Sequence, residues 1–345
     1  MKKLIFLILI LSLVLPNVAT SANMRISEFQ ITNTPDQKEF WPDIDGNIVV
    51  WTWGYGNSVD QYIAGYNLET QKYLNINQSY GYKQSPRVSG DWVVWVDRGV
   101  GGYSPPSGIY ASNIKTGEVR TIFTGVCGCL TYADIDGKYV VWDEESPSEY
   151  YQGIFLYDLS TQETTLINND PGLQWAPVTD SQWVVWNHMD ECPQCNDVTL
   201  RAYNINTKET INLPCGTNDY NPDISNNILV WQRGFFDIYG MNLSTQEVTT
   251  ITTSSDYSLS YPRIDGSSVV WGSSNGSIYH YDISTREIIT VTVGKSDALP
   301  SISSNVMVWV RSGDIYGARL YETIFLPLVK HDLSNPPSQV FDVEN

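Results

Sequence analysis

The chain has 345 residues, 42% of them hydrophobic, with 38 acidic against 20 basic side chains and a formal net charge of −18. A chain of this length and composition can bury a sizeable core. Its negative charge disfavours phosphate backbones and anionic membrane surfaces, so nucleic-acid binding and membrane-surface binding are excluded from the expected functions.

The first 22 residues predict a secretory signal peptide. Lys2 and Lys3 precede the apolar run Leu4 to Leu15, and mostly small residues then lead to Ala22, after which we expect cleavage. The run is short for a bilayer span, although an uncleaved anchor is the alternative. No cysteine follows it, which leaves lipoprotein anchoring unsupported. We therefore expect a secreted, extracellular or periplasmic protein, whose formal charge changes from −18 to −20 when the two lysines are removed.

One ten-residue pattern returns seven times after this segment. The first copy, Pro42 to Trp51, reads Pro-Asp-Ile-Asp-Gly-Asn-Ile-Val-Val-Trp. The other copies are Pro86 to Trp95, Ala133 to Trp142, Pro177 to Trp186, Pro222 to Trp231, Pro262 to Trp271 and Pro300 to Trp309. An Asp-Gly or Asn-rich step, which tolerates positive φ, precedes a β-branched and aromatic run, so each copy predicts strand, tight turn, strand. The closing tryptophans lie 38 to 47 residues apart, a period typical of propeller blades.

A second pattern follows the first six copies and predicts a third strand. Ile154 to Thr161, Ile-Phe-Leu-Tyr-Asp-Leu-Ser-Thr, is typical of it. A short Thr- and Ile-rich run such as Glu247 to Thr252 then predicts a fourth strand. A single four-stranded sheet of this kind exposes two apolar faces, so neighbouring sheets must stack. The sequence therefore predicts an all-β protein with a seven-bladed propeller over residues 23 to 322.

The two patterns together resemble the repeat of TolB-like, PD40-type β-propellers. That family usually carries Ser-Pro-Asp-Gly before an apolar strand, and here the box is altered to forms such as Pro42-Asp43-Ile44-Asp45-Gly46. The resemblance covers about residues 26 to 321 and implies a bacterial-type propeller. No α/β domain precedes the repeats as in TolB itself, and the resemblance specifies no ligand.

Two segments compete to close the ring. Ile26 to Thr32 stands where a fourth strand stands in other repeats, while the seventh repeat has no clear fourth strand of its own. The N-terminal strand is therefore expected to complete the last blade, which removes exposed sheet edges. Ile324 to Val329 is the alternative closing strand. Residues 323 to 345 otherwise form an apolar segment and a polar tail with a composition typical of disorder.

The loops after the second strand of each blade predict an asymmetric binding face, which we call the top face. They are long in the first four blades (53 to 61, 97 to 108, 143 to 153 and 187 to 198) and short in the last three. Long loops on a rigid scaffold are the usual place for recognition.

Aromatic residues concentrate on this face. The candidate ligand-binding residues are Trp53, Tyr55, Tyr103, Tyr150 and Tyr151 in the loops and Trp41, Trp175 and Tyr220 at the strand entrances, where Phe40, Tyr82, Tyr132 and Tyr261 also lie. Aromatics with polar tips suit stacking on sugar rings or on peptide side chains. Packing between adjacent blades is the alternative for the entrance residues. The seven motif tryptophans lie in the most apolar strands and are expected in the core.

The five cysteines fall on predicted top-face loops: Cys127, Cys129, Cys192, Cys195 and Cys215. In an exported protein they predict loop-stapling disulfides, with one cysteine left over because the number is odd. A metal loop at Cys192 to Cys195, near His188, is the alternative. The three histidines are spread along the chain, and we expect neither a metal nor a cofactor.

Three aspartates raise the question of catalysis. Asp43, Asp134 and Asp223 occupy equivalent inner-strand positions, which leaves a glycoside hydrolase or polysaccharide lyase as an alternative. Arg87 and Arg263 fill the same position in other blades, so an inner ring of salt bridges is favoured. We name no catalytic residue. The expected function is non-catalytic binding of an extracellular polysaccharide, peptide or protein, and an envelope structural or adhesion module is the further alternative.

Overall fold

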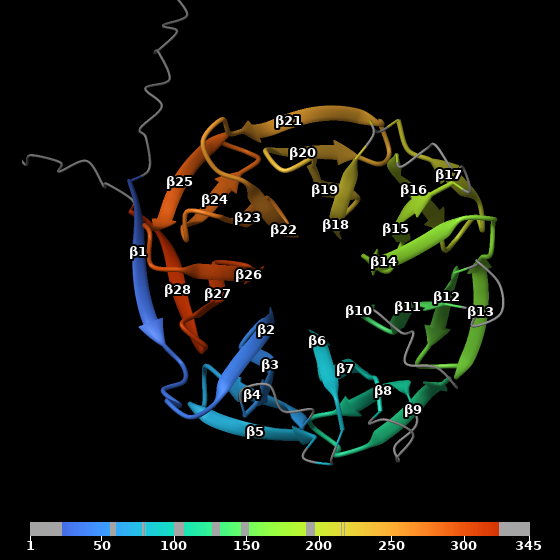
Figure 1. Ribbon diagram of the computed structural model, residues 1–345, viewed down its shortest axis with the longest axis horizontal. Coiled ribbons are helices and arrows are strands. Elements are labelled where there is room, and N and C mark those ends of the chain that lie inside the picture. The colour runs from blue at the N-terminus through green and yellow to red at the C-terminus, as the bar shows by residue number, and fades with distance from the viewer. Residues whose placement is uncertain are drawn as a thin grey trace, which may run out of the picture. The chain divides into compact units, whose positions relative to one another are not determined.

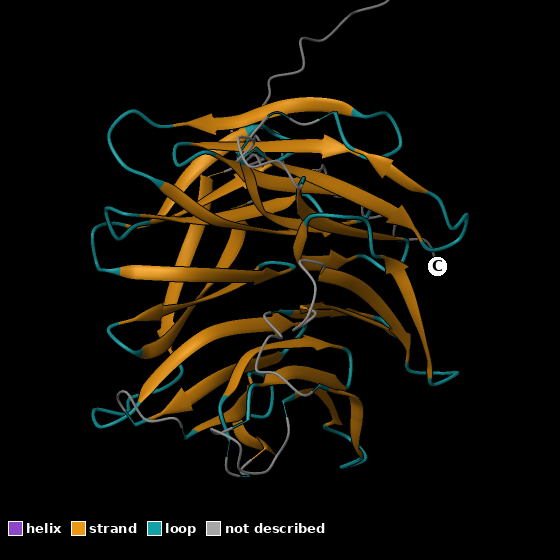
Figure 2. Ribbon diagram, turned by 45° about the vertical axis from the view of Figure 1, so that its right-hand side comes forward, coloured by secondary structure: helices purple, strands orange, loops and turns teal. Residues whose placement is uncertain are grey.

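The computed structural model describes residues 23–55, 60–77, 79, 81–99, 107–125, 132–145, 152–190, 197–214, 216 and 218–323. Ile26–Arg319 form one compact unit, in which seven four-stranded antiparallel sheets are arranged as blades around a central channel (Figure 1). Figure 2 shows that strands joined by loops make up the whole of this part of the chain. None of the described residues belongs to a helix that could cross a membrane.

Blades one to six each use four consecutive strands. In blades one to three the strands are β2 (Lys38–Asp45), β3 (Ile48–Gly54), β4 (Gln61–Asn67), β5 (Lys72–Asn77); β6 (Lys83–Ser89), β7 (Trp92–Asp97), β8 (Gly108–Asn113), β9 (Val119–Thr124); β10 (Ala133–Asp136), β11 (Tyr139–Glu145), β12 (Gln152–Asp158), β13 (Glu163–Asn168). In blades four to six they are β14 (Leu173–Thr179), β15 (Trp183–Met189), β16 (Val198–Asn204), β17 (Thr210–Asn212); β18 (Asp219–Ser225), β19 (Ile228–Arg233), β20 (Asp237–Asn242), β21 (Glu247–Thr253); β22 (Leu259–Asp265), β23 (Ser268–Ser273), β24 (Ile278–Asp282), β25 (Glu287–Thr292).

The seventh blade joins the two ends of the repeat array. Its strands are β26 (Asp297–Ser303), β27 (Val306–Arg311), β28 (Asp314–Thr323) and β1 (Asn23–Gln30), in the order β26-β27-β28-β1. The prediction that the N-terminal strand closes the ring is therefore confirmed. The competing segment, Ile324 to Val329, lies outside the described residues. Closure by β1 covers the edge of β28, which would otherwise present unpaired backbone groups.

The second strand of every blade forms the core. The seven motif tryptophans are at most 2% exposed, as predicted. Each second strand is packed on both faces, and apolar clusters join consecutive blades, for example Val94 and Ile109 of blade two with Ala133 and Trp142 of blade three. Burial of these side chains, at about 25 cal/mol per Å² of apolar surface, is what holds blade to blade.

The turn between the first two strands links each blade to the next through a hydrogen bond. Asp45 accepts from the Gly90 N–H at 2.7 Å, and Ser303 of the last blade accepts from the Gly46 N–H at 3.0 Å. The other five junctions are made by Ser89 with Gly137, Ser181 with Asp136, Asp180 with Asn227, Ser225 with Gly266 and Asp265 with Ser304. A polar side chain of this turn therefore connects neighbouring blades at each junction. Positive φ angles at Gly46 and Asn226 confirm the predicted tight turns.

Candidate functional site

The first strand of each blade lines the channel and bends at its entrance. A β-bulge interrupts its pairing with the second strand in six blades, as between Phe40 and Asp43. The residue at this bulge precedes proline and takes a left-handed φ of 48° to 55° at Trp41, Ser85, Ala176, Asn221, Tyr261 and Leu299. Such angles are uncommon for bulky residues and cost of order 1–3 kcal/mol each. The bulge turns these side chains toward the channel.

We call these six residues, together with Tyr132 of blade three, the mouth ring. All seven line one cavity of about 110 Å³ at the top-face end of the channel. Tyr132 and Tyr261 are 43% and 48% exposed, so their rings are open to solvent. For comparison, an apolar cavity of roughly 150 Å³ can hold benzene. The mouth therefore suits one ring or one side chain of a ligand rather than a whole polymer.

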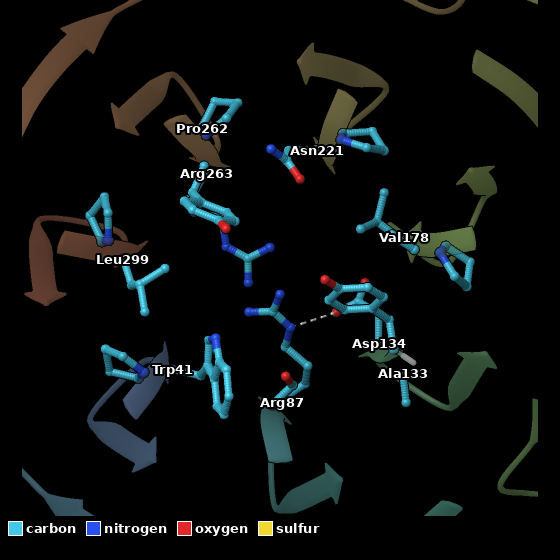
Figure 3. A pocket seen from close by; sticks show the side chains of 17 residues that line it. Trp41, Arg87, Ala133, Asp134, Val178, Asn221, Pro262, Arg263 and Leu299 are labelled. Atoms are coloured by element: carbon cyan, nitrogen blue, oxygen red, sulfur yellow. Dashed lines mark ion pairs between the residues drawn. The ribbon is translucent and has the colours of Figure 1, made fainter. Parts of the chain in front are cut away.

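A ring of charges forms the floor of this cavity. The equivalent position of the seven first strands carries Asp43, Arg87, Asp134, Val178, Asp223, Arg263 and Ser301. The guanidinium groups of Arg87 and Arg263 point toward each other across the channel (Figure 3). The ion pairs are Arg87 with Asp43 (3.4 Å) and Asp134 (3.7 Å), and Arg263 with Asp43 (3.3 Å) and Asp223 (3.1 Å). The predicted inner ring of salt bridges is confirmed.

Each aspartate of this charge ring also binds the backbone of the next blade. The second carboxylate oxygen accepts from Val88 N at 3.0 Å in Asp43, from Thr179 N at 2.9 Å in Asp134 and from Ile264 N at 2.7 Å in Asp223. These bonds satisfy buried backbone donors, which are costly to leave unpaired. The three carboxylates therefore have a structural role, whatever else they do.

Burial changes the pKa of two carboxyl groups in the charge ring. It raises the pKa of Asp134 to about 7, against the opposing effect of Arg87. It also raises the pKa of Asp223 well above its usual range, with the Asp134 charge adding to the rise. Three carboxyl groups face two guanidinium groups, so one bound proton makes the ring neutral. A carboxyl group of this kind can titrate near neutral pH.

A second cavity, of about 180 Å³, lies on the other side of the charge ring. Asp43, Asp134 and Asp223 all line it, together with Asp45 and Asp265, whereas Asp134 lines the mouth cavity as well. Within the described residues, no group of three or more His, Cys, Asp and Glu side chains could hold a metal ion. The acidic side chains here bind backbone N–H groups of neighbouring blades instead.

The predicted ligand-binding residues separate into three places. Trp41 lies in the mouth ring. Trp175 and Tyr220 each stand one residue before a mouth-ring residue and do not line the mouth cavity. Trp53 and Tyr55 lie in blade one, where Trp53 stacks on Tyr62 with ring centroids 4.7 Å apart and contacts Tyr55 edge-on. Tyr103, Tyr150 and Tyr151 lie outside the described residues.

The structure adds residues that the binding prediction did not include. Tyr132 and Tyr261 were noted only as entrance aromatics, and Asn221 and Leu299 were not singled out. The sequence does mark six of the mouth-ring positions, because each of these residues directly precedes the repeated proline at an equivalent position in its blade.

Two of the three histidines lie in the described part of the chain. Cys127, Cys129, Cys192, Cys195 and Cys215 lie outside the described residues, as does His331. His188 and His280 are 1% exposed and belong to β15 and β24 of different blades. Burial lowers the pKa of both imidazoles, so both are neutral at pH 7.

The strand-two to strand-three loops are long in blades one to four, as predicted. Strands β3 and β4 are separated by residues 55–60, β7 and β8 by 98–107, β11 and β12 by 146–151, and β15 and β16 by 190–197. In the last three blades the gaps shorten to 234–236, 274–277 and 312–313. The loops therefore differ in length between the two halves of the ring.

Comparison with known proteins supports the fold. No family model and no curated protein matches the chain. Among solved structures, the β-propeller domain of the Trilobed protease from Pyrococcus furiosus is 13% identical, with a TM-score of 0.64 over 88% of this chain and 100% of that one. Oligogalacturonate lyase from Vibrio parahaemolyticus is 13% identical, with a TM-score of 0.62 over 87% and 98%. Uncomplexed acylaminoacyl peptidase from Pyrococcus horikoshii is 13% identical, with a TM-score of 0.62 over 83% and 52%.

These identities show the fold alone. The chain has the architecture of a seven-bladed β-propeller. Its structural neighbours include a lyase and peptidases, so they do not distinguish a binding protein from an enzyme.

Proposed function

We propose that this protein is a non-catalytic, exported binding propeller that takes one ring or side chain of an extracellular polysaccharide or peptide into the mouth cavity. The observation that carries this proposal is the mouth ring. Its aromatic side chains, Trp41, Tyr132 and Tyr261, converge on a cavity floored by two guanidinium groups. Six of its residues are held in strained backbone conformations, and such strain concentrates at ligand-binding positions.

The shape and chemistry of the cavity favour binding over hydrolysis. Tyrosine and tryptophan rings stack on flat or apolar ligand surfaces, and the Asn221 amide adds a directional polar contact. Hydrolysis of a glycosidic bond ordinarily needs two carboxyl groups on either side of that bond. Of the three ring aspartates, Asp134 alone lines the mouth cavity, and its carboxylate is paired with Arg87 and Thr179.

One observation favours the enzyme alternative. The pKa of Asp134, raised by burial to about 7, suits a general acid at neutral pH. We therefore keep a glycoside hydrolase or polysaccharide lyase as the second candidate. A structural or adhesion role in the cell envelope is supported by no feature of the described residues.

The proposal also includes export of the protein and the type of its repeats. Residues 1–22 form a cleaved signal peptide by sequence pattern, and N-terminal sequencing of the mature protein tests this. We propose that the repeats are of the TolB-like type, because the residue before the turn, Asp45, Ser225 or Asp265, accepts a hydrogen bond from the backbone of the neighbouring blade. The formal net charge of −18 argues against nucleic acid as a partner.

The test measures retention and product release together on a panel of polysaccharides and peptides. Trp41→Ala and Tyr261→Ala are expected to abolish retention while the protein stays folded by circular dichroism. Tyr220→Ala is the matched control, because Tyr220 neighbours the mouth ring in sequence but does not line the cavity. Product release that disappears in Asp134→Asn would instead establish the enzyme. Retention that survives both mouth variants would refute the proposed site.

A further inference from the structure

Blade one contains a further cavity, separate from the two cavities of the channel. It has a volume of about 220 Å³, and its lining includes Glu39, Trp51, Trp53, Ala64 and Tyr73. Glu39 and Trp51 are buried, at 1% and 2% exposure, while Tyr73 is 61% exposed and opens the cavity to solvent. We call these five residues the blade-one cage. Its aromatic walls and single carboxylate differ from the proline-rich mouth.

Three other blades hold a pair of opposite charges at this position. Asp219 in blade five and Asp297 in blade seven pair across the strands with Arg233 and Arg311, as Glu39 pairs with Trp53. Arg233 Nε lies 2.8 Å from Asp219, and Arg311 Nε lies 2.5 Å from Asp297. In blade two the same position holds the buried pair Lys83 and Asp97, 3.3 Å apart. An acidic residue here therefore has a basic partner in blades five and seven, and blade two has the reversed pair.

The arginine of blades five and seven also lies over aromatic rings. The Arg233 guanidinium is 4.1 Å from the Tyr239 centroid and 5.9 Å from that of Trp231. The Arg311 guanidinium is 4.4 Å from Tyr316 and 5.6 Å from Trp309. In both blades the cation thus contacts a carboxylate, the motif tryptophan and the tyrosine that pairs with that tryptophan. Such cation–π contacts strengthen when the cation is desolvated.

Blade one keeps the carboxylate and the motif tryptophan but lacks the cation. Trp53 stands where Arg233 and Arg311 stand, and Ala64 stands where Tyr239 and Tyr316 stand. The small alanine is what leaves the cavity open. Within the described residues, Glu39 has no basic side chain within ion-pair distance, and its oxygens accept from the hydroxyls of Thr32 and Thr34.

The nearest basic residue, Lys38, does not supply the cation that is missing beside Glu39. Lys38 precedes Glu39 in β2, so its side chain points to the opposite face of the strand. Its ammonium group donates to the Ser312 carbonyl at 3.1 Å. Among the described residues, the other charge that acts on Glu39 is the Asp314 carboxylate, which accepts from the Thr34 N–H. The local charge of the cage is therefore negative.

We propose that the blade-one cage binds a guanidinium or alkylammonium group of an external ligand, which takes the place that Arg233 and Arg311 occupy in blades five and seven. The bound cation pairs with Glu39, lies over Trp51 and is enclosed by Trp53 and Tyr73. Recognition of cationic groups by aromatic walls with a nearby carboxylate is a recurrent form of ligand binding. The site is independent of the channel mouth, so either proposal can fail while the other stands.

The test uses ethylguanidinium as the probe and ethylurea as its neutral counterpart. Binding to the purified protein is followed through the indole N–H signals in two-dimensional NMR, at probe concentrations that leave the protein folded. Ethylguanidinium is expected to shift the Trp53 signal in a saturable way, and ethylurea is expected to leave it unchanged. Equal shifts with both probes, or no shift with ethylguanidinium, would overturn the proposal.

Two substitutions assign the site. Glu39→Gln keeps the shape of the side chain and is expected to weaken ethylguanidinium binding about tenfold or more, as for loss of a charge-assisted contact. Trp53→Arg supplies the missing cation within the chain, so probe binding should disappear while the melting temperature is kept or raised. Asp91→Asn, which removes an exposed carboxylate of blade two, controls for net charge and should leave binding unchanged. Full-strength binding in Glu39→Gln would refute the assignment.

Discussion

The carboxylate of Asp43 in blade one binds the backbone N–H of Val88 in blade two at 3.0 Å. The same side chain accepts from the Ser301 hydroxyl of blade seven at 2.8 Å and lies between the guanidinium groups of Arg87 and Arg263. One aspartate thus connects blades one, two, six and seven at the channel. This is the point at which the first and last repeats of the chain meet around the axis.

Replacing this carboxylate should destabilise the whole ring. We expect Asp43→Asn to lower the free energy of unfolding by about 3 kcal/mol, because each arginine loses one of its two carboxylate partners and the Val88 N–H loses a charged acceptor. Urea unfolding followed by tryptophan fluorescence measures this. Asp91→Asn removes an exposed carboxylate 4.0 Å from Lys115 and should cost less than about 0.5 kcal/mol. Equal effects of the two substitutions would contradict the structural role of Asp43.

Asp134 should make the protein less stable as the pH rises toward neutral. Its pKa is about 7 in the folded protein and 3.8 ordinarily, so between these values the folded state binds more protons than the unfolded state. Stability gained from this group is present at low pH and is lost as the pH rises through about 7, with a slope of at most about 1.4 kcal/mol per pH unit. Asp223 acts in the same direction.

The measurement compares the wild type with Asp134→Asn in urea across this pH range. The wild type should lose stability relative to the variant as the pH rises from about 4 to 7. A difference between the two proteins that does not change with pH would show that Asp134 stays ionised throughout.

The ion pair between Glu28 and Arg311 attaches the closing strand β1 to the rest of blade seven. Its carboxylate makes two hydrogen bonds with the Arg311 guanidinium, at 2.8 and 2.9 Å, and so joins β1 to β27. Arg311 and Lys295 hold the pKa of Glu28 below its ordinary value of 4.5. The resulting stability is present above pH 4.5 and is lost as the pH falls through the folded-state pKa.

We expect Glu28→Gln to cost about 1 kcal/mol at pH 7, because the pair is partly exposed. The cost should vanish at low pH, where the wild-type carboxyl is protonated. Thermal unfolding of both proteins at neutral and acidic pH measures this difference. A cost that persists undiminished in acid would point to packing rather than charge.

The buried pair of blade two should respond to the loss of one partner and tolerate the loss of both. Lys83 and Asp97 are 1% and 2% exposed, and burial lowers the pKa of the lysine against the effect of the aspartate. We expect Asp97→Asn to cost about 3 kcal/mol, since it leaves a buried ammonium group without a counter-charge. The double variant Lys83→Met with Asp97→Leu should recover most of that loss, as measured by urea unfolding. A double variant no more stable than Asp97→Asn would contradict this explanation.

The repeated pattern predicted more of the fold than of the site. Trp51 and its six counterparts revealed the blades because a β-branched and aromatic strand that is buried on both faces must look alike in every repeat. The offset of Ile26 to Thr32 from Trp51 likewise predicted the closing strand. Such features depend on local periodicity, which the sequence displays directly.

The residues of the candidate site were only partly predictable from the sequence for a related reason. Trp41 lies in the mouth cavity, whereas Trp175 and Tyr220 lie one position before residues that line it, because a β-bulge determines which residue turns toward the channel. In a strand, neighbouring side chains point to opposite faces, so a shift of one residue turns a side chain away from the channel.

The sequence by itself determined the seven blades, the buried tryptophans, the closing strand and the alternation of acidic and basic residues at one inner position. Only the tertiary structure decided which side chains meet. Arg87 and Arg263 lie 176 residues apart, by subtraction of their numbers, yet they face each other across the channel (Figure 3). Strand register likewise sets Glu39 opposite Trp53, whereas Asp219 and Asp297 lie opposite Arg233 and Arg311. The physical reason is that strand pairing and ring closure, rather than distance along the chain, bring these charges together.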